Sequence, residues 1–349
     1  MNIYLLTDYK NNFGSKWHAK PYRSGFDKEL LVKYFDEFGY EAVFLQFKDV
    51  VFNGDDFWRG KIVLYTSSEE PGLHYKSFIE DIVLGLELAG AITIPRYPFL
   101  RANNNKVFME ILKDQLLSTI ITRSCKKYGT KEELISDFHS DNLTFPVVYK
   151  LASGAMSRNV FLAFNKGQLL RIVNSNSRTR HLRSEIVDII RQRKHKGYKK
   201  ESKYQGKFIM QQFIPELKND WKVLVFGNHY YLLYRGIKPD DFRASGSHYD
   251  YRAGSDASFP VEMLDIVKGI YEKLEIPHLS VDIAYDGTDW IIHEFQALYF
   301  GTSTMVFSDD YYEKIGGEWV VVEKKVDQEK EYVSGVASYL KKHRDFVNK

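Results

Sequence analysis

The sequence predicts an α/β protein that begins with an open, largely parallel sheet and ends with an antiparallel one. Over the first hundred residues, short apolar runs alternate with stretches whose apolar residues recur at helical spacing. Later in the chain, apolar strands are joined by tight turns, which indicates hairpins and antiparallel pairing. A chain of 349 residues has room for two or three such subdomains.

Residues 1–100 form the predicted N-terminal α/β domain. The strands that we expect in it are residues 2–6, 40–46, 61–66 and 91–95, and the helices lie near 25–38 and 73–89. In an open parallel sheet, ligands bind at the carboxyl ends of the strands. The loop after the first strand lies at such an end, so it is a candidate for binding a substrate carboxylate, although basic loops are also common on surfaces. Its basic residues are Lys16, His18, Lys20 and Arg23.

A helix that starts near Lys106 follows this domain. The asparagines before Lys106 can cap the helix, but a lysine in the first turn opposes the helix dipole, which suggests another use for this side chain. We expect a strand next, over residues 118–124. Thr130 and Glu133 then have the spacing of a capping box and predict the start of a short helix.

Residues 145–164 are predicted to form a strand, a loop of small residues and a returning strand. Lys150 ends the first strand, and the loop contains Ser153, Gly154 and Ser157. Small residues let backbone N–H groups approach a phosphate closely, and a lysine adds a point charge. Because the loop has only one glycine, an ordinary hairpin loop explains the pattern equally well.

The antiparallel region begins with a strand over residues 207–216. Two further strands follow that turn at Gly227, and then a polar loop with Arg243. A helix is expected near residues 260–274, and a polar strand and a helix over residues 319–349.

The segment 281–296, VDIAYDGTDWIIHEFQ, is the hairpin on which the functional interpretation depends. If its loop is 287–289, Asp282 lies opposite Glu294, and the period of two places Gln296 on the same face. Two carboxylates and a carboxamide oxygen suit a hard cation such as Mg²⁺, which keeps positions for phosphate oxygens and water. Taken alone, an acidic hairpin is more often simply solvated.

Positive charge is concentrated in residues 171–207, which hold twelve Lys or Arg against three acidic residues. This segment carries +9 and the rest of the chain −6. Such a block is often a solvated face or a flexible insertion, but it would also attract an anionic substrate or polymer, such as an acidic glycan or peptide. Nucleic-acid binding is the weaker interpretation, because the segment has no run of aromatic side chains for base stacking.

The single cysteine, Cys125, excludes an intramolecular disulfide and fits a reducing compartment. No run of about 18 apolar residues is present, and the first residues lack a basic leader. We therefore expect a cytoplasmic protein with no membrane span. Cys125 is not expected to be catalytic.

The order and spacing of these elements over about residues 100–305 resemble the ATP-grasp superfamily. The similarity is to carboxylate–amine ligases such as the enzyme that adds glutamate tails to a ribosomal protein, and to glutathione synthetase-like enzymes. The resemblance implies an ATP-grasp domain over residues 101–349, with a lid subdomain at about 145–210, that follows the N-terminal domain. It also implies ATP as substrate and two Mg²⁺ ions, for which Mn²⁺ could substitute.

The resemblance assigns expected roles to individual residues. Lys106 and Lys150 would contact the nucleotide phosphates, and the loop with Ser153, Gly154 and Ser157 would cover them. Other residues that the resemblance places at the nucleotide are Gln211, Gln212, Phe213, Ile214, Asp220 and Ser245.

The resemblance assigns metal binding and catalysis to a second group of residues. Asp282, Glu294 and Gln296 match the metal ligands, Lys222 would hold phosphate oxygens, and Arg243 would stabilise the tetrahedral oxyanion. Four positions depart from the family pattern: Gln212 stands for glutamate, Lys222 for arginine, and Ser245 and Gln296 each for asparagine. The extra methylene of Gln296 changes its reach towards a metal.

Three functions fit these residues. The first is an ATP-dependent carboxylate–amine ligase that forms an amide bond through an acyl phosphate. The second is a kinase of the same fold that stops after phosphoryl transfer. The third is a nucleotide-binding regulatory protein without turnover, which the retained carboxylates and Arg243 disfavour.

Overall fold

The computed structural model describes residues 1–14, 25–54, 56–120, 125–138, 143–154, 159–325 and 327–343. It divides into two compact units, each of which is described by itself. Unit 1 comprises Met1–Asn103, Leu112–Ile121 and Leu217–Lys349. Unit 2 comprises Asn104–Ile111 and Thr122–Glu216.

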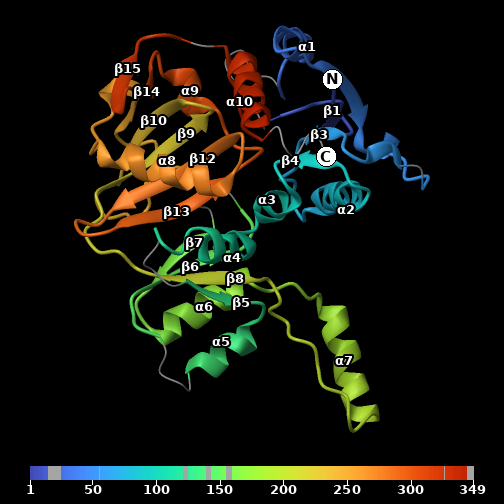
Figure 1. The fold of residues 1–349 in the computed structure, drawn as a ribbon. Coiled ribbons are helices and arrows are strands. Elements are labelled where there is room, and N and C mark those ends of the chain that lie inside the picture. The colour runs from blue at the N-terminus through green and yellow to red at the C-terminus, as the bar shows by residue number, and fades with distance from the viewer. Residues whose placement is uncertain are drawn as a thin grey trace. The chain divides into compact units, whose positions relative to one another are not determined.

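Unit 1 contains the predicted parallel sheet, with the strand order β2-β1-β3-β4 (Figure 1). Its strands are β1 (Asn2–Thr7), β2 (Glu41–Gln46), β3 (Ile62–Tyr65) and β4 (Ile92–Ile94), all parallel. The helices of this region are α1 (Lys28–Glu37), α2 (His74–Leu88) and α3 (Tyr97–Ala102), with short 3₁₀ turns at Phe47–Asp49 and Asp56–Trp58. The predicted alternation of strands and helices is confirmed.

The C-terminal helix α10 (Gln328–Lys342) completes the core of this N-terminal sheet. Its buried residues Val333 and Val336 belong to the same apolar cluster as Leu5 of β1 and Leu31 of α1. The backbone N–H just before α1 also donates to the side chain of Glu329, at 2.8 Å. Because burial of apolar surface is the main stabilising term, this packing joins the two ends of the chain into one unit.

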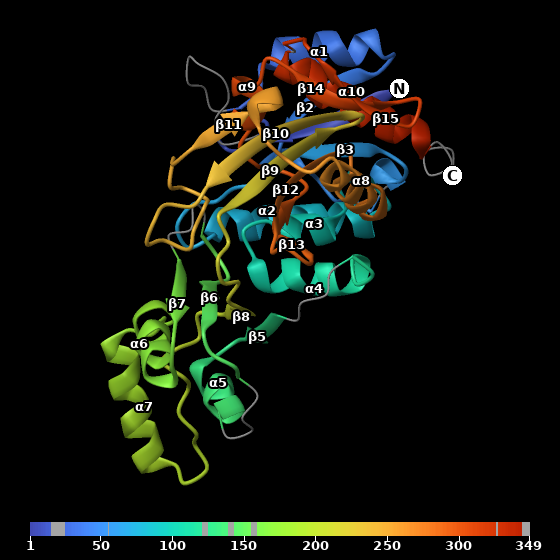
Figure 2. The same ribbon diagram turned by 90° about the vertical axis from the view of Figure 1, so that its left-hand side faces the viewer.

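The second sheet of unit 1 is antiparallel, with the order β13-β12-β9-β10-β14-β15 and β11 paired to β10 (Figure 2). Its strands are β9 (Asn219–Phe226), β10 (His229–Gly236), β11 (Tyr251–Ala253), β12 (His278–Tyr285), β13 (Trp290–Gln296), β14 (Tyr311–Ile315) and β15 (Glu318–Val322). The helical segments are a 3₁₀ turn at Gly254–Asp256, α8 (Glu262–Leu274) and α9 (Ser303–Phe307). The predicted turn at Gly227 and the helix near 260–274 are confirmed.

Unit 2 is built on a four-stranded antiparallel sheet with the order β5-β8-β6-β7. The strands are β5 (Cys125–Tyr128), β6 (Val147–Leu151), β7 (Val160–Ala163) and β8 (Phe208–Gln212). Its helices are α5 (Lys131–Phe138), α6 (Lys166–Asn176) and α7 (Leu182–Lys194), together with the first half of α4 (Lys106–Leu116).

The capping box before α5 is confirmed. The Glu133 side chain accepts from the Thr130 N–H at 3.1 Å, and the Thr130 hydroxyl oxygen accepts from the Glu133 N–H at 3.3 Å. This reciprocal pair satisfies two N–H groups that the first helical turn leaves without partners.

The expected strand over residues 118–124 is wrong for residues 118–120, which form a turn after α4. The strand β5 lies next in the chain, where Tyr128 stacks on Phe208 of the neighbouring strand with ring centroids 5.2 Å apart. Aromatic packing across the sheet therefore outweighs the apolar character of the earlier run. Residues 121–124, the basic loop from Lys16 to Arg23, and Ser157 lie outside the described residues.

The membrane prediction was tested on the helices of the described segments. None of them combines the length and the apolar character that crossing a bilayer requires.

Protonation of His278 is expected to weaken the fold in mild acid. This side chain is 4% exposed, its Nε2–H donates to the Tyr332 carbonyl at 2.8 Å, and burial lowers its pKa to about 4 from an ordinary 6.5. Between these pH values the unfolded chain binds more protons, so stability is full above about 6.5 and falls by up to about 3 kcal/mol towards pH 4.

Denaturant unfolding of the wild type and of His278→Gln at several pH values between 4 and 7 tests this expectation. The variant should lose less stability than the wild type over this interval, because it lacks the titrating ring. His195→Gln, at an exposed position, serves as the control and should follow the wild type. Equal pH slopes for the wild type and His278→Gln would contradict the prediction.

Candidate functional site

A row of polar side chains crosses three neighbouring strands of unit 1. Lys222 on β9 pairs with Asp282 on β12, and Asp282 pairs with Glu294 on β13. In the same way, Ser280 pairs with Gln296. Directly opposed residues project from the same face of a sheet, so the predicted juxtaposition of Asp282 and Glu294 is confirmed.

The turn and the strand register of this hairpin differ from the prediction, although the pairing is the predicted one. Its turn comprises the four residues 286–289 rather than the three residues 287–289. One extra residue on β13, His293, forms a β-bulge, and the register shifts by one position. The bulge offsets the longer turn, so that Asp282 still faces Glu294.

Arg235 on β10 links two aspartates, and it was missed by the sequence analysis. Its Nε and Nη2 atoms donate to the two carboxylate oxygens of Asp220 at 2.7 and 2.8 Å. Nη2 also lies 2.9 Å from Oδ2 of Asp282. The turn at Gly227 already places Arg235 opposite Asp220 in a regular hairpin, so extending the register would have shown the pair.

The electrostatics of Asp282 follow from these contacts. Burial would raise the pKa of this carboxyl, but the neighbouring Arg235 and Lys222 outweigh burial and hold its pKa well below the usual range. Lys222 Nζ lies 3.4 Å from the other oxygen of Asp282 and donates to the Ser280 hydroxyl at 2.7 Å. Asp282 is therefore ionised, with a cation at each of its oxygens.

The donor set fits a hard cation. Asp282 and Glu294 supply carboxylate oxygens, and Gln296 supplies an amide oxygen, which are the ligand types that Mg²⁺ prefers. Within the described part of the chain, no group of three or more His, Cys, Asp or Glu is placed to hold a metal. A metal at this row would therefore rest on two carboxylates and one amide, and it would share Asp282 with Arg235.

Arg243 and Ser245, which sequence analysis also placed at the site, lie in the loop after β10. The Arg243 guanidinium donates to both oxygens of Asp241, at 3.0 and 3.2 Å, and its side chain is 41% exposed. No hydrogen bond or ion pair between described residues joins Arg243 or Ser245 to Asp282. Their assignment to the site stays a prediction.

In unit 2, Lys106 and the loop of small residues lie together. The Lys106 N–H donates to the Ala152 carbonyl at 2.8 Å, and its Nζ donates to the Gly154 carbonyl at 2.8 Å. The Gly154 N–H in turn donates to the side chain of Asn104, at 2.7 Å. Gly154 has φ of +120°, and a Cβ there would lie 2.6 Å from Nδ2 of Asn159, so glycine is required at this position.

Lys150 and Gln211 share one face of the unit 2 sheet. Their neighbours Tyr149 and Met210 point into the apolar core, so the period of two turns Lys150 and Gln211 to the opposite face. Gln211 donates to the carboxylate of Glu110 on α4 at 2.9 Å, one helical turn after Lys106. This contact brings Gln211 to the helix that carries Lys106.

The remaining predicted residues of unit 2 lie along β8 and the small loop. Gln212 ends β8 and is exposed, and Ile214 is half-buried. The Phe213 N–H donates to the Pro146 carbonyl at 3.4 Å, and the Ser153 carbonyl accepts from Asn159 at 3.1 Å.

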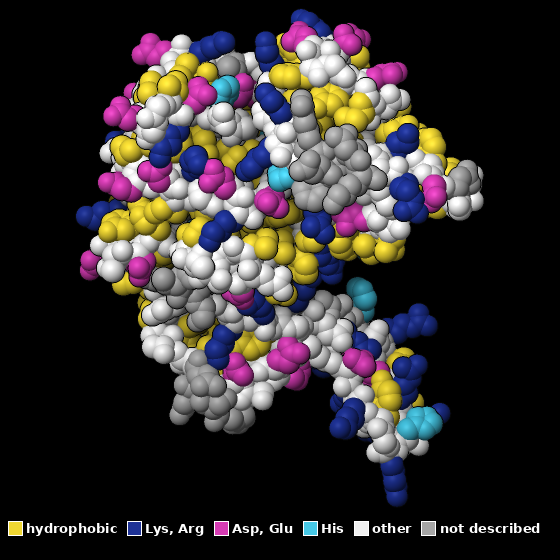
Figure 3. Space-filling view, viewed as in Figure 1, with side chains coloured by type: hydrophobic (Ala, Val, Ile, Leu, Met, Phe, Trp, Pro, Cys, Tyr) yellow, Lys and Arg dark blue, Asp and Glu magenta, His cyan; other side chains and the backbone are white. Residues whose placement is uncertain are grey.

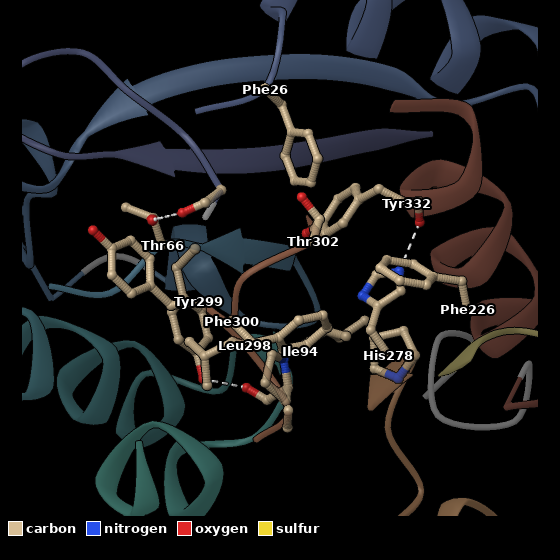
Figure 4. Close-up of a pocket in the computed structure, with 15 residues that line it drawn as sticks. Phe26, Thr66, Ile94, Phe226, His278, Leu298, Tyr299, Phe300, Thr302 and Tyr332 are labelled. Carbon is tan, nitrogen blue, oxygen red and sulfur yellow. Dashed lines mark hydrogen bonds between the residues drawn. The ribbon is translucent and has the colours of Figure 1, made fainter. Parts of the chain in front are cut away.

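A cavity of about 40 Å³ lies within unit 1 at the carboxyl ends of β3 and β4 (Figure 4). Both threonines of the lining donate to protein partners: Thr66 donates to the Gly14 carbonyl at 2.7 Å, and Thr302 donates to Gln328 at 2.9 Å. The interior is therefore mainly apolar. The apolar lining includes Phe26, Ile94, Phe226, Leu298, Phe300 and Tyr332.

This cavity and the polar row lie on one face of the antiparallel sheet. His278, which lines the cavity, and Asp282 are four residues apart on β12, so the period of two gives them the same face. At about 3.3 Å per residue, the two positions are about 13 Å apart along the strand.

No protein-family model matches the chain, and no curated protein matches it significantly in sequence. Solved structures do match it along nearly its whole length. A RimK domain ATP-grasp protein from Sphaerobacter thermophilus is 15% identical with a TM-score of 0.52, and the match covers 97% of this chain and 99% of that one. The D-cycloserine synthetase DcsG is 12% identical with a TM-score of 0.53, over 97% and 100% of the two chains. The ATP-grasp ligase PsnB is 12% identical with a TM-score of 0.50, over 97% and 98%.

Removal of Arg235 is expected to destabilise unit 1 strongly. Arg235→Met leaves the charges of Asp220 and Asp282 buried without this partner, which costs about 3–5 kcal/mol of unfolding free energy. Denaturant unfolding measures the loss. The control Arg243→Met removes a half-exposed pair and should cost less than about 1 kcal/mol.

A double variant separates the charge effect from lost packing. Adding Asp220→Asn to Arg235→Met removes one of the two unpaired charges, so it should recover part of the stability. An Arg235→Met variant that is as stable as the wild type would show that the bridge does not support the fold.

Proposed function

We propose that this chain, whose fold is that of the ATP-grasp proteins, is an ATP-dependent ligase that joins a carboxylate to an amine. The observation that carries the proposal is the row of Lys222, Asp282 and Glu294, which places a cation and two carboxylates side by side. Phosphoryl transfer needs oxygen ligands for a metal and cations for phosphate oxygens. Two of the similar structures are described as a synthetase and a ligase, which supports this reaction class.

The nucleotide-binding role is proposed for residues of both units. Lys106 and Lys150 would hold phosphate oxygens, and the segment 211–214 would contact the base. Asp220 is 5% exposed and is held by Arg235, so we assign it to positioning Asp282 rather than to direct contact. The further residues proposed at the nucleotide are Ser153, Gly154, Ser157 and Ser245.

The domain organisation proposed for this function follows the sequence. Residues 1–100 form the domain that precedes ATP-grasp, residues 101–349 form the ATP-grasp domain, and residues 145–210 act as the lid. In the chain, the boundaries of unit 2 lie near residues 104, 111, 122 and 216, so the segment proposed as the lid lies wholly within unit 2.

The proposed reaction has two steps. A carboxylate oxygen of the acid attacks the γ-phosphorus of ATP while the bond to the bridging oxygen of ADP breaks, which gives an acyl phosphate and ADP. The amine nitrogen then attacks the acyl carbon and loses a proton, and phosphate leaves with the electron pair of the broken C–O bond. No protein nucleophile is needed, which agrees with leaving Cys125 out of the chemistry.

The side chains support these steps in distinct ways. Asp282, Glu294 and Gln296 would hold Mg²⁺, which when bound supplies positive charge to the β- and γ-phosphates. Lys222 lies next to Asp282 and is placed to hold a phosphate oxygen. Arg243 would stabilise the oxyanion of the second step after exchanging its contact with Asp241 for the substrate.

Two features bear on the substrates. The cavity at β3 and β4 would accept a small apolar part of one substrate, because most of its lining is apolar and its two threonines already have protein partners. The positive segment 171–207 favours an anionic acceptor, such as an acidic peptide or glycan.

Product analysis tests the reaction class. The chain is incubated with Mg²⁺, ATP and a panel of acids and amines, and the products are identified by mass spectrometry. Release of ADP and phosphate that requires both an acid and an amine, with a new amide, is the expected result. A phosphorylated acid that accumulates and never reacts with an amine would identify a kinase instead.

Glu294→Ala is expected to reduce turnover to less than about a tenth of the wild-type value, because loss of a metal ligand raises the barrier by several kcal/mol. It should also weaken Mg²⁺-dependent ATP binding in calorimetry, while the thermal midpoint shifts by only a few degrees. Glu318→Ala, on an exposed side chain of β15, is the control and should change neither quantity. Wild-type ATP binding and turnover by Glu294→Ala would remove Glu294 from the site.

Backbone hydrogen exchange over residues 145–210 is expected to slow when Mg²⁺ and ATP are added. A lid that closes over a nucleotide loses local opening motions, and its amides become protected. Strands β1 and β3 provide the internal reference, because their buried backbone is already protected. Exchange that is unchanged across 145–210 would exclude a lid.

A further inference from the structure

The acidic side chains of helix α7 point towards the chain segments that precede and follow the helix. Glu185 forms ion pairs with Arg178 at 2.7 Å and with Lys203 at 2.5 Å, on the segments before and after the helix. Asp188 is 2% exposed and forms an ion pair with Arg180. Both acids of α7 are therefore neutralised from one side.

A neighbouring side of α7 is apolar and exposed, and Glu185 lies at its edge. Leu182, Ile186, Ile189 and Ile190 are 70, 58, 42 and 48% exposed. Their spacing of four, seven and eight residues from Leu182 places them in one stripe along the helix. In Figure 1, α7 stands apart from the sheet of unit 2. An exposed apolar stripe of this kind is typical of a site that binds another protein or a membrane.

Basic residues follow the apolar stripe along the chain. Residues 191–200 contain six Lys or Arg and no acidic residue, and all of them except Tyr198 are exposed. Arg193 lies four residues after Ile189, and Lys194 lies four after Ile190, so both extend the line of the stripe. Figure 3 shows dark blue side chains around the yellow ones in the region of α7. The six bases are Arg191, Arg193, Lys194, Lys196, Lys199 and Lys200.

Most partners would use only half of this surface. A soluble anionic acceptor accounts for the bases but leaves the isoleucines in water. A second copy of the helix would cover the isoleucines, but it would bring two sets of bases together, which is repulsive. A nucleic acid would gain nothing from aliphatic side chains where base stacking needs aromatic ones.

We propose that α7 docks on an anionic phospholipid surface. The stripe of Leu182, Ile186, Ile189 and Ile190 enters the interface, and the bases of 191–200 lie among the headgroups. A projecting helix presents a convex edge, which suits a flat lipid surface, and long basic side chains can bury their stems while their charges reach the headgroups. The contact is peripheral, and it does not depend on the proposed ligase reaction.

Vesicle co-sedimentation of the full chain tests the proposal. The wild type should bind vesicles of phosphatidylcholine that contain about one third phosphatidylglycerol, and it should bind pure phosphatidylcholine at least about tenfold more weakly. Binding should fall as salt rises from 0.1 to 1 M, because the headgroup attraction is screened.

Two double variants separate the apolar contribution from the charge. Ile186→Ser with Ile190→Ser should weaken binding on the order of tenfold, because two buried aliphatic side chains are lost. Leu88→Ser with Ile315→Ser removes side chains that are 81 and 54% exposed elsewhere, and it should bind as the wild type does. All four positions are exposed, and circular dichroism checks that the variants fold.

Three outcomes would overturn the proposal. The first is a wild type that does not sediment with anionic vesicles. The second is wild-type binding by the Ile186→Ser, Ile190→Ser variant, which would leave only electrostatic attraction. The third is binding of a soluble polyglutamate peptide that displaces the chain from vesicles and is itself weakened by the isoleucine variant, which would assign the stripe to an acidic polypeptide.

Discussion

The site in unit 1 depends on the bridge from Arg235 to Asp220 and Asp282. An ionised carboxylate is costly to bury, and the cost is offset only when a cation and hydrogen bonds accompany it. Arg235 meets this condition with a two-point contact to Asp220 and a third contact to Asp282. The planar guanidinium fixes the direction of each bond, so Asp282 keeps its charge and its orientation before any ligand binds. Preorganised charge of this kind is what the proposed phosphoryl transfer would require.

In unit 2, a local network of hydrogen bonds holds Lys106 and the loop at Gly154 together. Lys106 begins α4, where a positive charge opposes the helix dipole. The hydrogen bond from its Nζ to the Gly154 carbonyl offsets this unfavourable position, and the Gly154 N–H is held in turn by Asn104. The loop therefore has a fixed base on the helix. The sequence showed that Lys106 was misplaced for a plain helix, but it did not show the partner, because Gly154 lies 48 residues away.

Much of the fold and part of the site could be predicted, because local periodicity carries that information. The alternation of strands and helices predicted the parallel sheet, and Gly227 predicted the β9–β10 hairpin. What periodicity cannot supply is contact between distant segments: α10 completes the core around Leu5, and aromatic packing of Tyr128 decides where β5 lies. The bulge at His293 shows a third limit. The predicted turn was one residue too short and the prediction lacked the bulge, and these two errors cancelled to give the predicted pair.

One face of the antiparallel sheet changes character along its strands. On β12 the residues that alternate onto this face run from Asp282 through Ser280 to His278, and on β9 they run from Lys222 to Phe226. Charge therefore gathers at one end, and aromatic side chains gather at the other, where they line the cavity. The alternation of side chains along each strand predicts this gradient, and no contact between distant segments is needed to predict it. Between the two ends, Leu224 on β9 is fully buried in an apolar cluster with Phe226 and Phe300. The same alternation that builds the sheet therefore separates the charged row from the cavity by packed side chains.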